Sequence, residues 1–423
     1  LPMKTVRCIL QRGKDRPVKN RHPWIFSGAI DRIDEGFEAG DLVRVLSDKE
    51  EFLGLGYLNP KSQIVVRMLA FEDIPVDEAF FDTKIAQAFE IRKRFVPLSS
   101  RFSSTGSTRA STDFFSEKND ENRVLPHGTN AYRLIHSEGD FLPGLVVDVY
   151  GDFLVVEFNT AGIDAWKPVI VKCLQKYFPS HSIFERSDSD LRKWEGLKRS
   201  VGALAGSEPP ETIEIQENGL FFGVDVRSGQ KTGFFLDQRE NREMVRGLSA
   251  GKRVLNCFAY TGGFSVYAAK GGAKEVVSVE SSEPAVAMGR KNFQRNQLGA
   301  EQSIWAQQDV FDYLRATKKE FDMIILDPPA FCKSKGQVQP AARGYKDINL
   351  QALKQLPKGG LLFTFSCSSY ISPDLFQKII FGAASDARRD VRILKKTSHA
   401  FDHPINIYHP EGEYLKGLLC EVV

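Results

Sequence analysis

The sequence of 423 residues has no apolar run that approaches the roughly 20 residues needed to cross a bilayer. Its most apolar stretch, residues 359–366 (GGLLFTFS), is short and rich in strand-forming residues, so it predicts a buried β-strand. The first residues, LPMKTVRCIL, lack the charged and then apolar leader of a secretory signal. We therefore expect neither a membrane protein nor a secreted one.

Cysteine and histidine are scarce and scattered. The six cysteines stand at positions 8, 173, 257, 332, 367 and 420. They form no CxxC pair, and although His399 and His403 have the HxxxH spacing, no cysteine stands close to them in the sequence, so the clustered ligands of a structural zinc site are missing and no metal is predicted. So large a chain with so few cysteines is not a disulfide scaffold, which favours a reducing, cytoplasmic environment. A single cysteine can still act as a nucleophile.

Excess charge is also lacking, because 57 basic and 54 acidic residues leave a net charge of only +3. The basic residues are nevertheless concentrated in places. Residues 1–24 carry seven against Asp15, residues 333–346 carry four and no acid, and residues 388–396 carry five against Asp390. Such clusters suit contact with phosphates at selected faces. Solvated surface loops are the alternative for each cluster.

The first part of the chain divides into three segments of different character. Short β-like runs at residues 42–46, 52–58 and 64–69, broken by glycine and aspartate, predict a small barrel. A helix is expected over residues 76–94. Residues 99–122 contain ten serines and threonines and predict a flexible insertion.

Strands and a helix then alternate from residue 132 to about 215, which predicts an α+β middle domain. The expected domains are a barrel over residues 1–72, a middle domain over 73–218 that contains the insertion, and a third domain over 219–423.

Regular β-α alternation marks the third domain. Strands are expected at residues 253–258, 276–280, 303–307, 321–326 and 361–366, with helices over 264–270 and from the cap Ser282 to about 298. This alternation predicts an α/β fold with a doubly wound, mostly parallel sheet, which binds its ligand at the carboxyl ends of the strands.

The residues at those strand ends indicate a nucleoside ligand. Residues 256–263 (NCFAYTGG) form a glycine-bearing turn from strand to helix but lack the GxGxxG pattern of dinucleotide sites. Glu280 ends the second strand 18 residues after Gly262, where an acid accepts hydrogen bonds from ribose hydroxyls. Asp309 ends the third unit, in position for an adenine edge. An adenosine group without a diphosphate suggests S-adenosyl-L-methionine (SAM), although either acid could instead cap a helix.

The fourth and fifth strands end in residues suited to chemistry on a base. Two prolines, Pro328 and Pro329, stiffen the loop that holds Asp327 and Phe331, and a rigid polar group beside an aromatic plane suits a base flipped out of its stack. Cys367 follows the fifth strand on the same rim. From position alone it is equally a nucleophile or a small packing residue.

Four motifs of the third domain are NCFAYTGGFSV, DPPAFCKSK, RGYKDIN and FSCSS. With these motifs the sequence resembles the bacterial class I SAM-dependent large-subunit (23S) rRNA 5-methylcytosine methyltransferases with an N-terminal PUA domain, an RNA-binding barrel. HPWIFSGAI resembles the PUA domain, ERSDSDLRKWEGL and KTGFFLDQRENR match the middle domain and the entry to the catalytic domain, and HPEGEYLKGLL matches the C-terminal tail. The resemblance covers nearly the whole chain, the segment 99–122 excepted.

The resemblance implies the site residues. Cys367 would be the attacking thiol, and Asp327 would bind the target base. Residues that would contact SAM are Asp237, Gln238, Arg239, Asn256, Phe258, Tyr260, Thr261, Gly262, Gly263, Glu280, Asp309 and Asp327. Residues that would contact the RNA are Pro328, Pro329, Phe331, Lys333, Lys335 and Arg343. One departure concerns product release: where many such enzymes carry a second cysteine this chain has Ala330, and Cys332 is either a substitute or a packing residue.

Two other functions remain open. A related enzyme could methylate a guanine ring nitrogen without a nucleophile, but the cysteine in FSCSS favours cytosine. A catalytically inactive RNA-binding assembly factor is disfavoured by the complete set of acids and glycines. We expect large-subunit rRNA as partner, captured partly by the basic N-terminal segment beside Trp24 and Phe26, and no membrane. A homodimer is compatible with the sequence.

Overall fold

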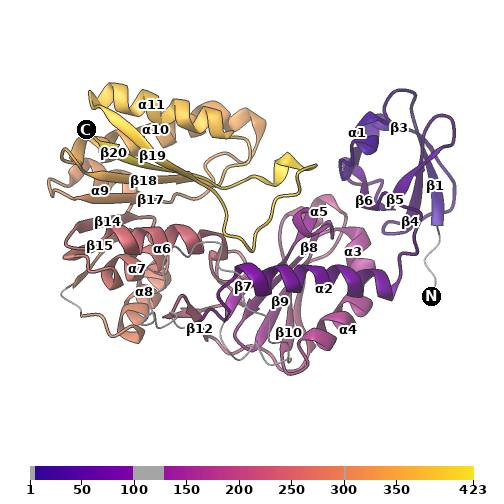
Figure 1. Cartoon of the computed structure of the whole chain (residues 1–423), viewed down its shortest axis with the longest axis horizontal. Helices are drawn as coiled ribbons and strands as arrows, with labels where there is room; N and C mark the ends of the chain where they lie inside the picture. Colours follow the sequence, from indigo (N-terminus) through magenta and orange to yellow (C-terminus); the bar gives the residue numbers. More distant parts are fainter. Residues whose placement is uncertain (1–4, 99–127, 300–301) are drawn as a thin grey trace, which may run out of the picture. The chain divides into compact units, whose positions relative to one another are not determined.

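The computed structural model describes residues 5–98, 128–299 and 302–423, so the predicted insertion at 99–122 lies outside the described residues (Figure 1). The chain forms two compact units. Unit 1 consists of Leu1–Ile215, Val224–Leu236 and Phe401–Gly412, and unit 2 consists of Gln216–Gly223, Asp237–Ala400 and Glu413–Val423.

Unit 1 begins with a six-stranded sheet in the order β2-β6-β5-β4-β1-β3. Its strands are β1 (Thr5–Leu10), β2 (Trp24–Phe26), β3 (Ile30–Ile33), β4 (Leu42–Leu46), β5 (Phe52–Leu58) and β6 (Ile64–Ala70). The two edge strands, β2 and β3, follow each other in the chain through the single 3-10 turn η1 (Ser27–Ala29), so the sheet curls enough for three residues to join its two edges. The short helix α1 (Arg16–Lys19) precedes β2. The three strands predicted for this barrel are confirmed.

The rest of unit 1 is an α+β layer, as predicted. Its sheet has the order β11-β10-β9-β8-β7, and the long helix α2 (Glu78–Phe95) packs on helix α4 (Lys167–Tyr177). The strands are β7 (Ala131–His136), β8 (Leu145–Tyr150), β9 (Phe153–Phe158), β10 (Ser182–Ser187) and β11 (Ser200–Ala205). Short helices α3 (Ala161–Ala165) and α5 (Leu191–Trp194) complete it. Helix α2 begins two residues later than predicted because Asp77 is its N-cap and accepts from the Phe80 amide.

The barrel and the middle layer share one hydrophobic core. Leu42, Tyr57 and Leu69 of the barrel pack with buried residues of α2, α4 and the middle sheet. A Cβ atom on Gly162 of α3 would overlap the Tyr57 ring, so only glycine allows this close approach. The Glu195 carboxylate also pairs with Arg67 of β6 at 2.8 Å.

Unit 2 contains a seven-stranded sheet in the order β16-β15-β14-β17-β18-β20-β19. Its strands are β14 (Arg253–Cys257), β15 (Glu275–Glu280), β16 (Ser303–Gln307), β17 (Met323–Leu326), β18 (Leu361–Ser366), β19 (Val391–Thr397) and β20 (Lys416–Val422). The first five pair in parallel, and β20 runs antiparallel to both β18 and β19. The small hairpin of β12 (Ile213–Glu217) and β13 (Leu220–Val224) precedes them.

Helices cover both faces of this sheet, which confirms the doubly wound architecture (Figure 1). Helices α6 (Arg239–Leu248), α7 (Gly263–Lys270) and α8 (Glu283–Arg295) lie on one side. Helices α9 (Val310–Ala316), α10 (Val338–Gln355) and α11 (Pro373–Ala387) build a core on the other. The strand order reverses between β14 and β17, so the carboxyl ends of these two strands border the crevice where such sheets bind ligands.

Three predicted boundaries in unit 2 needed correction, and two strands were missed. The strand predicted over 253–258 is one residue too long, because Phe258 has a left-handed backbone conformation with φ of 60° that ends the strand. The strand predicted from Phe321 begins at Met323. The residue just before it, Asp322, uses its carboxylate to accept a hydrogen bond from the Arg253 amide. Helix α8 ends at Arg295 because Gln297 turns left-handed, and strands β19 and β20 were not predicted.

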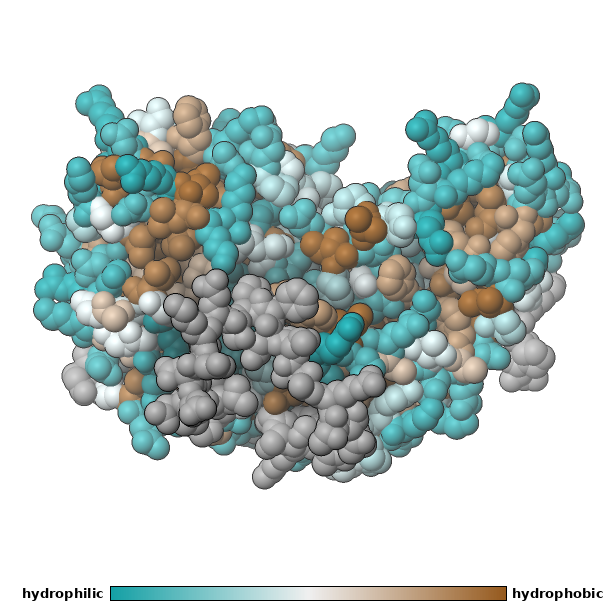
Figure 2. All heavy atoms as spheres, viewed as in Figure 1, coloured by the Kyte–Doolittle hydropathy of each residue, from teal (hydrophilic) through white to brown (hydrophobic). Residues whose placement is uncertain are grey.

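All six residues of β18 are buried, which confirms the buried strand predicted from the most apolar stretch. Within the ranges that the structure describes, no helix combines the length and the apolar character that crossing a bilayer requires. On the face shown in Figure 2, hydrophobic residues form separate patches among hydrophilic ones.

Candidate active site

The turn from β14 to α7 is held in a strained conformation at the end of the sheet. Phe258, Tyr260 and Gly262 all have left-handed backbones, with φ of 60°, 47° and 80°. The Tyr260 amide donates to Glu280 Oε2 at 2.8 Å, and this bond ties the turn to the end of β15. Left-handed residues other than glycine cost about 1–3 kcal/mol each and cluster at ligand-binding turns. The structure thus brings the predicted turn and Glu280 together.

Two buried oxygens in this turn fit a polar ligand. Asn256 Nδ2 donates to the Ser265 hydroxyl at 2.8 Å. Asn256 Oδ1 and Thr261 Oγ1 are buried without a hydrogen-bond partner in the described part of the chain. Leaving such an atom unsatisfied costs about 1–3 kcal/mol, so a ligand that supplies donors here would recover that energy. The hydroxyl and amino groups of SAM are donors of this kind.

The two acids predicted for the nucleoside differ in their surroundings. Glu280 is half-buried, and its second oxygen accepts from the Ser282 amide at 2.9 Å. Asp309 is exposed and is the N-cap of α9, accepting from the amides of Phe311 and Asp312 at 2.8 and 3.2 Å. The sequence left open whether this acid caps a helix, and the structure shows that Asp309 does cap α9. Its carboxylate nevertheless lies at the end of β16, beside the strand that ends in Glu280.

The segment before α6 meets the loop after β17. Gln238 Nε2 donates to Asp327 Oδ1 at 3.0 Å, and Asn241 Nδ2 donates to Gln238 Oε1 at 2.6 Å. The Tyr414 hydroxyl donates to Asp237 Oδ2 at 2.6 Å. The structure thus joins Gln238 and Asp327, both expected from sequence, and adds Asn241 and Tyr414, which were missed. Asn241 follows Gln238 by three residues, a helical spacing that could have indicated it.

Cys367 lies against the same loop. Its thiol is 3.8 Å from the Pro328 carbonyl oxygen, and it is half-buried whereas the other five cysteines are buried. The next residue, Ser368, accepts from the Cys332 amide at 3.1 Å and hydrogen-bonds the Tyr345 hydroxyl at 2.9 Å. The end of β18 and the Asp-Pro-Pro loop therefore form one rim, as the sequence predicted.

The residues expected to contact RNA surround this rim. The Phe331 ring lies 4.7 Å from the Tyr345 ring and 6.2 Å from the Phe258 ring, measured between centroids, so packing fixes its plane. Pro328 is buried and Pro329 is exposed. Three basic side chains are exposed and form no ion pair with the described residues: Lys333, Lys335 and Arg343.

Cys332 has the surroundings of a packing residue. It is only 2% exposed, it belongs to the core beneath α10, and its thiol donates to the Ser334 carbonyl oxygen at 3.2 Å. A buried thiol engaged in this way is poorly placed to release product.

Lys416, the first residue of β20, is a polar residue at this rim that sequence reasoning missed. It is 5% exposed, and its Nζ donates to the Ser368 carbonyl oxygen at 2.6 Å. Burial lowers the pKa of Lys416 to about 8. A negative charge on Cys367 acts in the other direction and raises the pKa of the lysine. The signal in the sequence was a lysine that opens a strand in which Glu421 is the one other charged residue, KGLLCEV.

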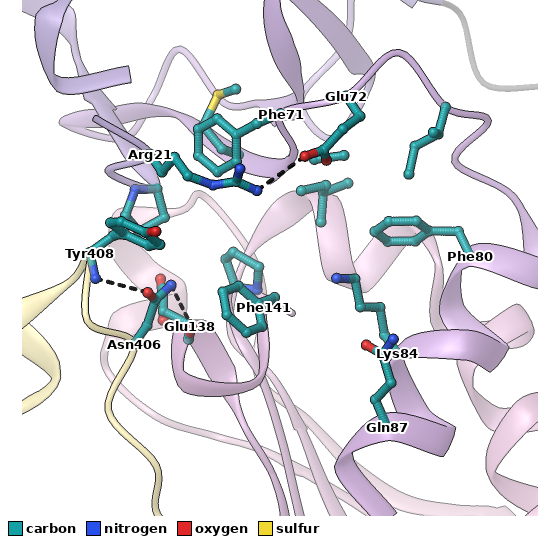
Figure 3. Close-up of a pocket in the computed structure, with 16 residues that line it drawn as sticks. Arg21, Phe71, Glu72, Phe80, Lys84, Gln87, Glu138, Phe141, Asn406 and Tyr408 are labelled. Carbon is teal, nitrogen blue, oxygen red and sulfur yellow. Dashed lines mark hydrogen bonds and ion pairs between the residues drawn. The ribbon is translucent and has the colours of Figure 1, made fainter. Parts of the chain in front are cut away.

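A separate cavity of about 200 Å³ lies within unit 1 (Figure 3). Its walls include Arg21, which pairs with Glu72 at 3.2 Å, and Lys84, whose ammonium is 5.1 Å from the centre of the Phe141 ring. None of the residues predicted to contact SAM or the target base lines it, although Arg21 belongs to the basic N-terminal segment.

Comparison with known proteins assigns the chain to a family. Residues 197–394 match the family of S-adenosylmethionine-dependent methyltransferases, and residues 8–71 match the PUA-like domain. The chain is 41% identical over 423 residues to ribosomal RNA large subunit methyltransferase I of Aliivibrio fischeri (strain MJ11), covering 99% of this chain and 100% of that one. The protein of that name from Aeromonas salmonicida is 43% identical, covering 98% of this chain and 99% of that one. The chain belongs to the ribosomal RNA large subunit methyltransferase I family.

Solved structures agree with this family assignment. A structure described as a SAM-dependent methyltransferase from Streptococcus mutans has a TM-score of 0.79 and 25% identity, covering 98% of this chain and 100% of that one. A methyltransferase complexed with SAH gives the same TM-score and identity and covers 99% of this chain and 100% of that one. As a member of the ribosomal RNA large subunit methyltransferase I family, the chain is a SAM-dependent methyltransferase with an N-terminal PUA-like domain, which confirms the resemblance, the fold class and the cofactor expected from sequence.

Proposed function

We propose that this chain methylates carbon 5 of a cytosine in large-subunit ribosomal RNA through a covalent adduct with Cys367. The observation that supports this most directly is the position of the Cys367 thiol, half-buried and 3.8 Å from the Pro328 carbonyl oxygen of the Asp-Pro-Pro loop. The names of the relatives supply the class of RNA. A guanine methyltransferase would have no use for a thiol at this rim.

The thiol is needed because carbon 5 of cytosine is a weak nucleophile. Addition of the Cys367 thiolate to carbon 6 makes carbon 5 electron-rich, so that it can take the methyl group. Carbon 5 then loses its proton to a base, the double bond between carbons 5 and 6 re-forms, and the bond from sulfur to carbon 6 breaks to return the thiolate. When bound, SAM supplies the methyl group as an electrophile.

Asp327 would hold the base during addition. Its carboxyl group can hydrogen-bond the ring nitrogen and the amino group of cytosine and so stabilise the adduct. Gln238 donates to Asp327 Oδ1 and is itself held by Asn241, so two amides fix the orientation of this carboxylate. Phe331, held among aromatic rings, would lie beside the base.

We further propose that SAM lies against the turn of residues 256–263, the segment 237–239, Glu280, Asp309 and Asp327. We keep the three-domain division at residues 1–72, 73–218 and 219–423. The match of residues 8–71 to the PUA-like domain supports its first part. A cytoplasmic location and a homodimer remain predictions.

The first prediction concerns SAM. Glu280→Ala and Asp309→Ser should each weaken SAM binding about tenfold to a hundredfold, because a hydrogen bond to a charged group contributes roughly 1.5–3 kcal/mol. Serine at position 309 can still cap α9, so that variant removes the carboxylate and leaves the cap. Titration calorimetry with SAM measures both. Unchanged affinity in both variants would refute the placement of the pocket, and NAD should show no binding.

The second prediction concerns RNA capture by the barrel. Trp24 is half-buried and its ring lies 4.3 Å from the His409 ring between centroids, whereas Phe26 is 49% exposed and better placed for stacking. Arg12, Lys14 and Arg16 are exposed, and the described residues offer them no ion pair. We propose that these three side chains contact phosphates.

Changing all three to alanine should weaken binding to rRNA fragments and lower the slope of log K against log salt by about 2, since each phosphate contact on a single strand contributes about 0.7. Filter binding across a salt series measures both quantities. Deleting the barrel is a poor test because its core is shared with the middle layer. The control is Lys172→Ala with Lys176→Ala, two lysines that already pair with Glu78 and Asp82. If the control variant lost as much affinity for rRNA fragments, the proposed phosphate contacts of Arg12, Lys14 and Arg16 would be contradicted.

A further inference from the structure

Lys416 reaches across the end of the strand that carries the thiol. It opposes Ser366, the last residue of β18, in the antiparallel pair of β18 and β20. Its Nζ donates to the carbonyl oxygen of Ser368 at 2.6 Å. Cys367 stands between these two residues in the chain, so the lysine contacts the backbone on both sides of the thiol-bearing residue.

The ammonium of Lys416 is buried without a carboxylate. It is 5% exposed, and within the described ranges no acid forms an ion pair with it. A buried charge is costly unless another group compensates it. Burial lowers the pKa of Lys416 to about 8, whereas negative charge on Cys367 and Glu413 raises it. Because electrostatic coupling is reciprocal, the charge on Lys416 favours the thiolate of Cys367 as much as the thiolate favours the ammonium.

The other buried or half-buried titratable groups on the elements packed here do not favour a thiolate, and the cations around the rim that would favour it, Lys333, Lys335 and Arg343, are exposed, so solvent screens them. Tyr345 of α10 hydrogen-bonds Ser368, and burial raises the pKa of its hydroxyl, so it is neutral near pH 7. Asp327, next to Pro328, and Glu413, just before β20, would disfavour a second negative charge when ionised. The buried Cys332 thiol donates to Ser334. A thiolate at position 367 therefore needs a cation close by.

We propose that Lys416 is a positioning residue whose ammonium stabilises the thiolate of Cys367 and whose hydrogen bond to Ser368 fixes the turn that presents it. This inference rests on the proposed function, because it gives a nucleophile its reactive form. A purely structural role would need only the hydrogen bond to Ser368, and the charge would be incidental. The two roles differ in their effect on the titration of Cys367.

The test is the pH dependence of Cys367 alkylation by iodoacetamide, measured on the full chain without RNA or SAM. The Cys367→Ser variant supplies the background from the other cysteines, of which Cys8 and Cys420 have a pKa raised by burial to about 12. In the wild-type protein the Cys367 thiol should titrate below the ordinary thiol pKa of about 8.5. Lys416→Gln keeps a donor for Ser368 but removes the charge, and it should react about tenfold more slowly at pH 7, since an opposite charge at close range shifts a pKa by about one unit or more.

The conservative variant Lys416→Arg should restore the wild-type profile to within about threefold, because it keeps the cation. SAM binding by calorimetry verifies that each variant is folded. A midpoint at or above about 8.5 for Cys367 alkylation in the wild-type protein overturns the proposal without any variant. The proposal is also overturned if the Lys416→Gln variant shows the same pH profile as wild type. RNA takes no part in this measurement. Failure of cytosine methylation with a shifted thiol profile would therefore reject the proposed function and leave the coupling of Lys416 to Cys367 standing.

Discussion

The Cys367→Ala variant is expected to lose methyl transfer to RNA completely while its affinity for SAM stays that of wild type. The thiol is proposed to activate carbon 5 and not to hold the cofactor, so its loss should remove chemistry without emptying the SAM pocket. Transfer of labelled methyl groups to rRNA fragments measures turnover. With wild type, RNA carrying 5-fluorocytosine at the target should become covalently attached in the presence of SAM, because fluorine cannot leave as a proton.

This adduct should survive denaturing electrophoresis and be absent from Cys367→Ala. The matched control is Cys332→Ala, which removes a buried thiol that donates to Ser334. It should keep turnover with a modest loss of stability. Accumulation of a covalent complex on unmodified RNA in that control would instead assign product release to Cys332. Full methylation by Cys367→Ala would end the 5-methylcytosine proposal and favour guanine.

Asp327→Asn is expected to lower kcat/KM by roughly 100-fold to 1,000-fold, the usual cost of removing one preorganised group that stabilises developing charge. Asparagine has the same shape and can still accept from Gln238 through its carbonyl oxygen, so the loop should stay in place. Single-turnover methylation of an rRNA fragment at saturating SAM isolates the chemical step.

A carboxylate at the opposite end of the same strand provides the control for this variant. Asp322 precedes β17 and accepts from the Arg253 amide at 2.8 Å, far from the carboxyl end where the site lies. Asp322→Asn should leave the rate unchanged. Equal rates for Asp327→Asn and wild type would remove Asp327 from the base site.

The parallel core of unit 2 was predictable because its signals are local. Apolar runs ending in glycine, an acid or proline mark β14, β15 and β17, and the carboxyl ends of parallel strands meet at one edge. The prediction therefore placed Glu280 beside the turn and Cys367 beside the Asp-Pro-Pro loop without knowledge of any contact. Strand β19 was missed because its lysines and arginines read as a basic cluster, with no apolar run around them.

Two of the missed residues, Tyr414 and Lys416, depend instead on contacts distant in sequence. Tyr414 reaches Asp237 across 177 positions, and Lys416 reaches Ser368 across 48. Both belong to the C-terminal segment, whose place in the sheet follows from antiparallel pairing with β18. A residue pattern shows which side chains can bond, but it does not show which strand will lie beside them. Asp309 illustrates the converse, because its capping role was visible in sequence and the structure contains it.

The position of β20 between β18 and β19 has a consequence for folding during synthesis. The strand that separates this pair is made after both of them, so β19 has no sheet neighbour and β18 has only β17 when each first leaves the ribosome. One edge of β18, an apolar strand, stays unpaired until β20 arrives, and an open edge of this kind is prone to mispairing with other chains. The nascent protein would therefore be most vulnerable to aggregation at a late stage. Completion of that edge also brings Lys416 to the Ser368 carbonyl oxygen, next to Cys367, so under the proposed coupling the thiol would acquire its buried cation in the same folding step that closes the sheet.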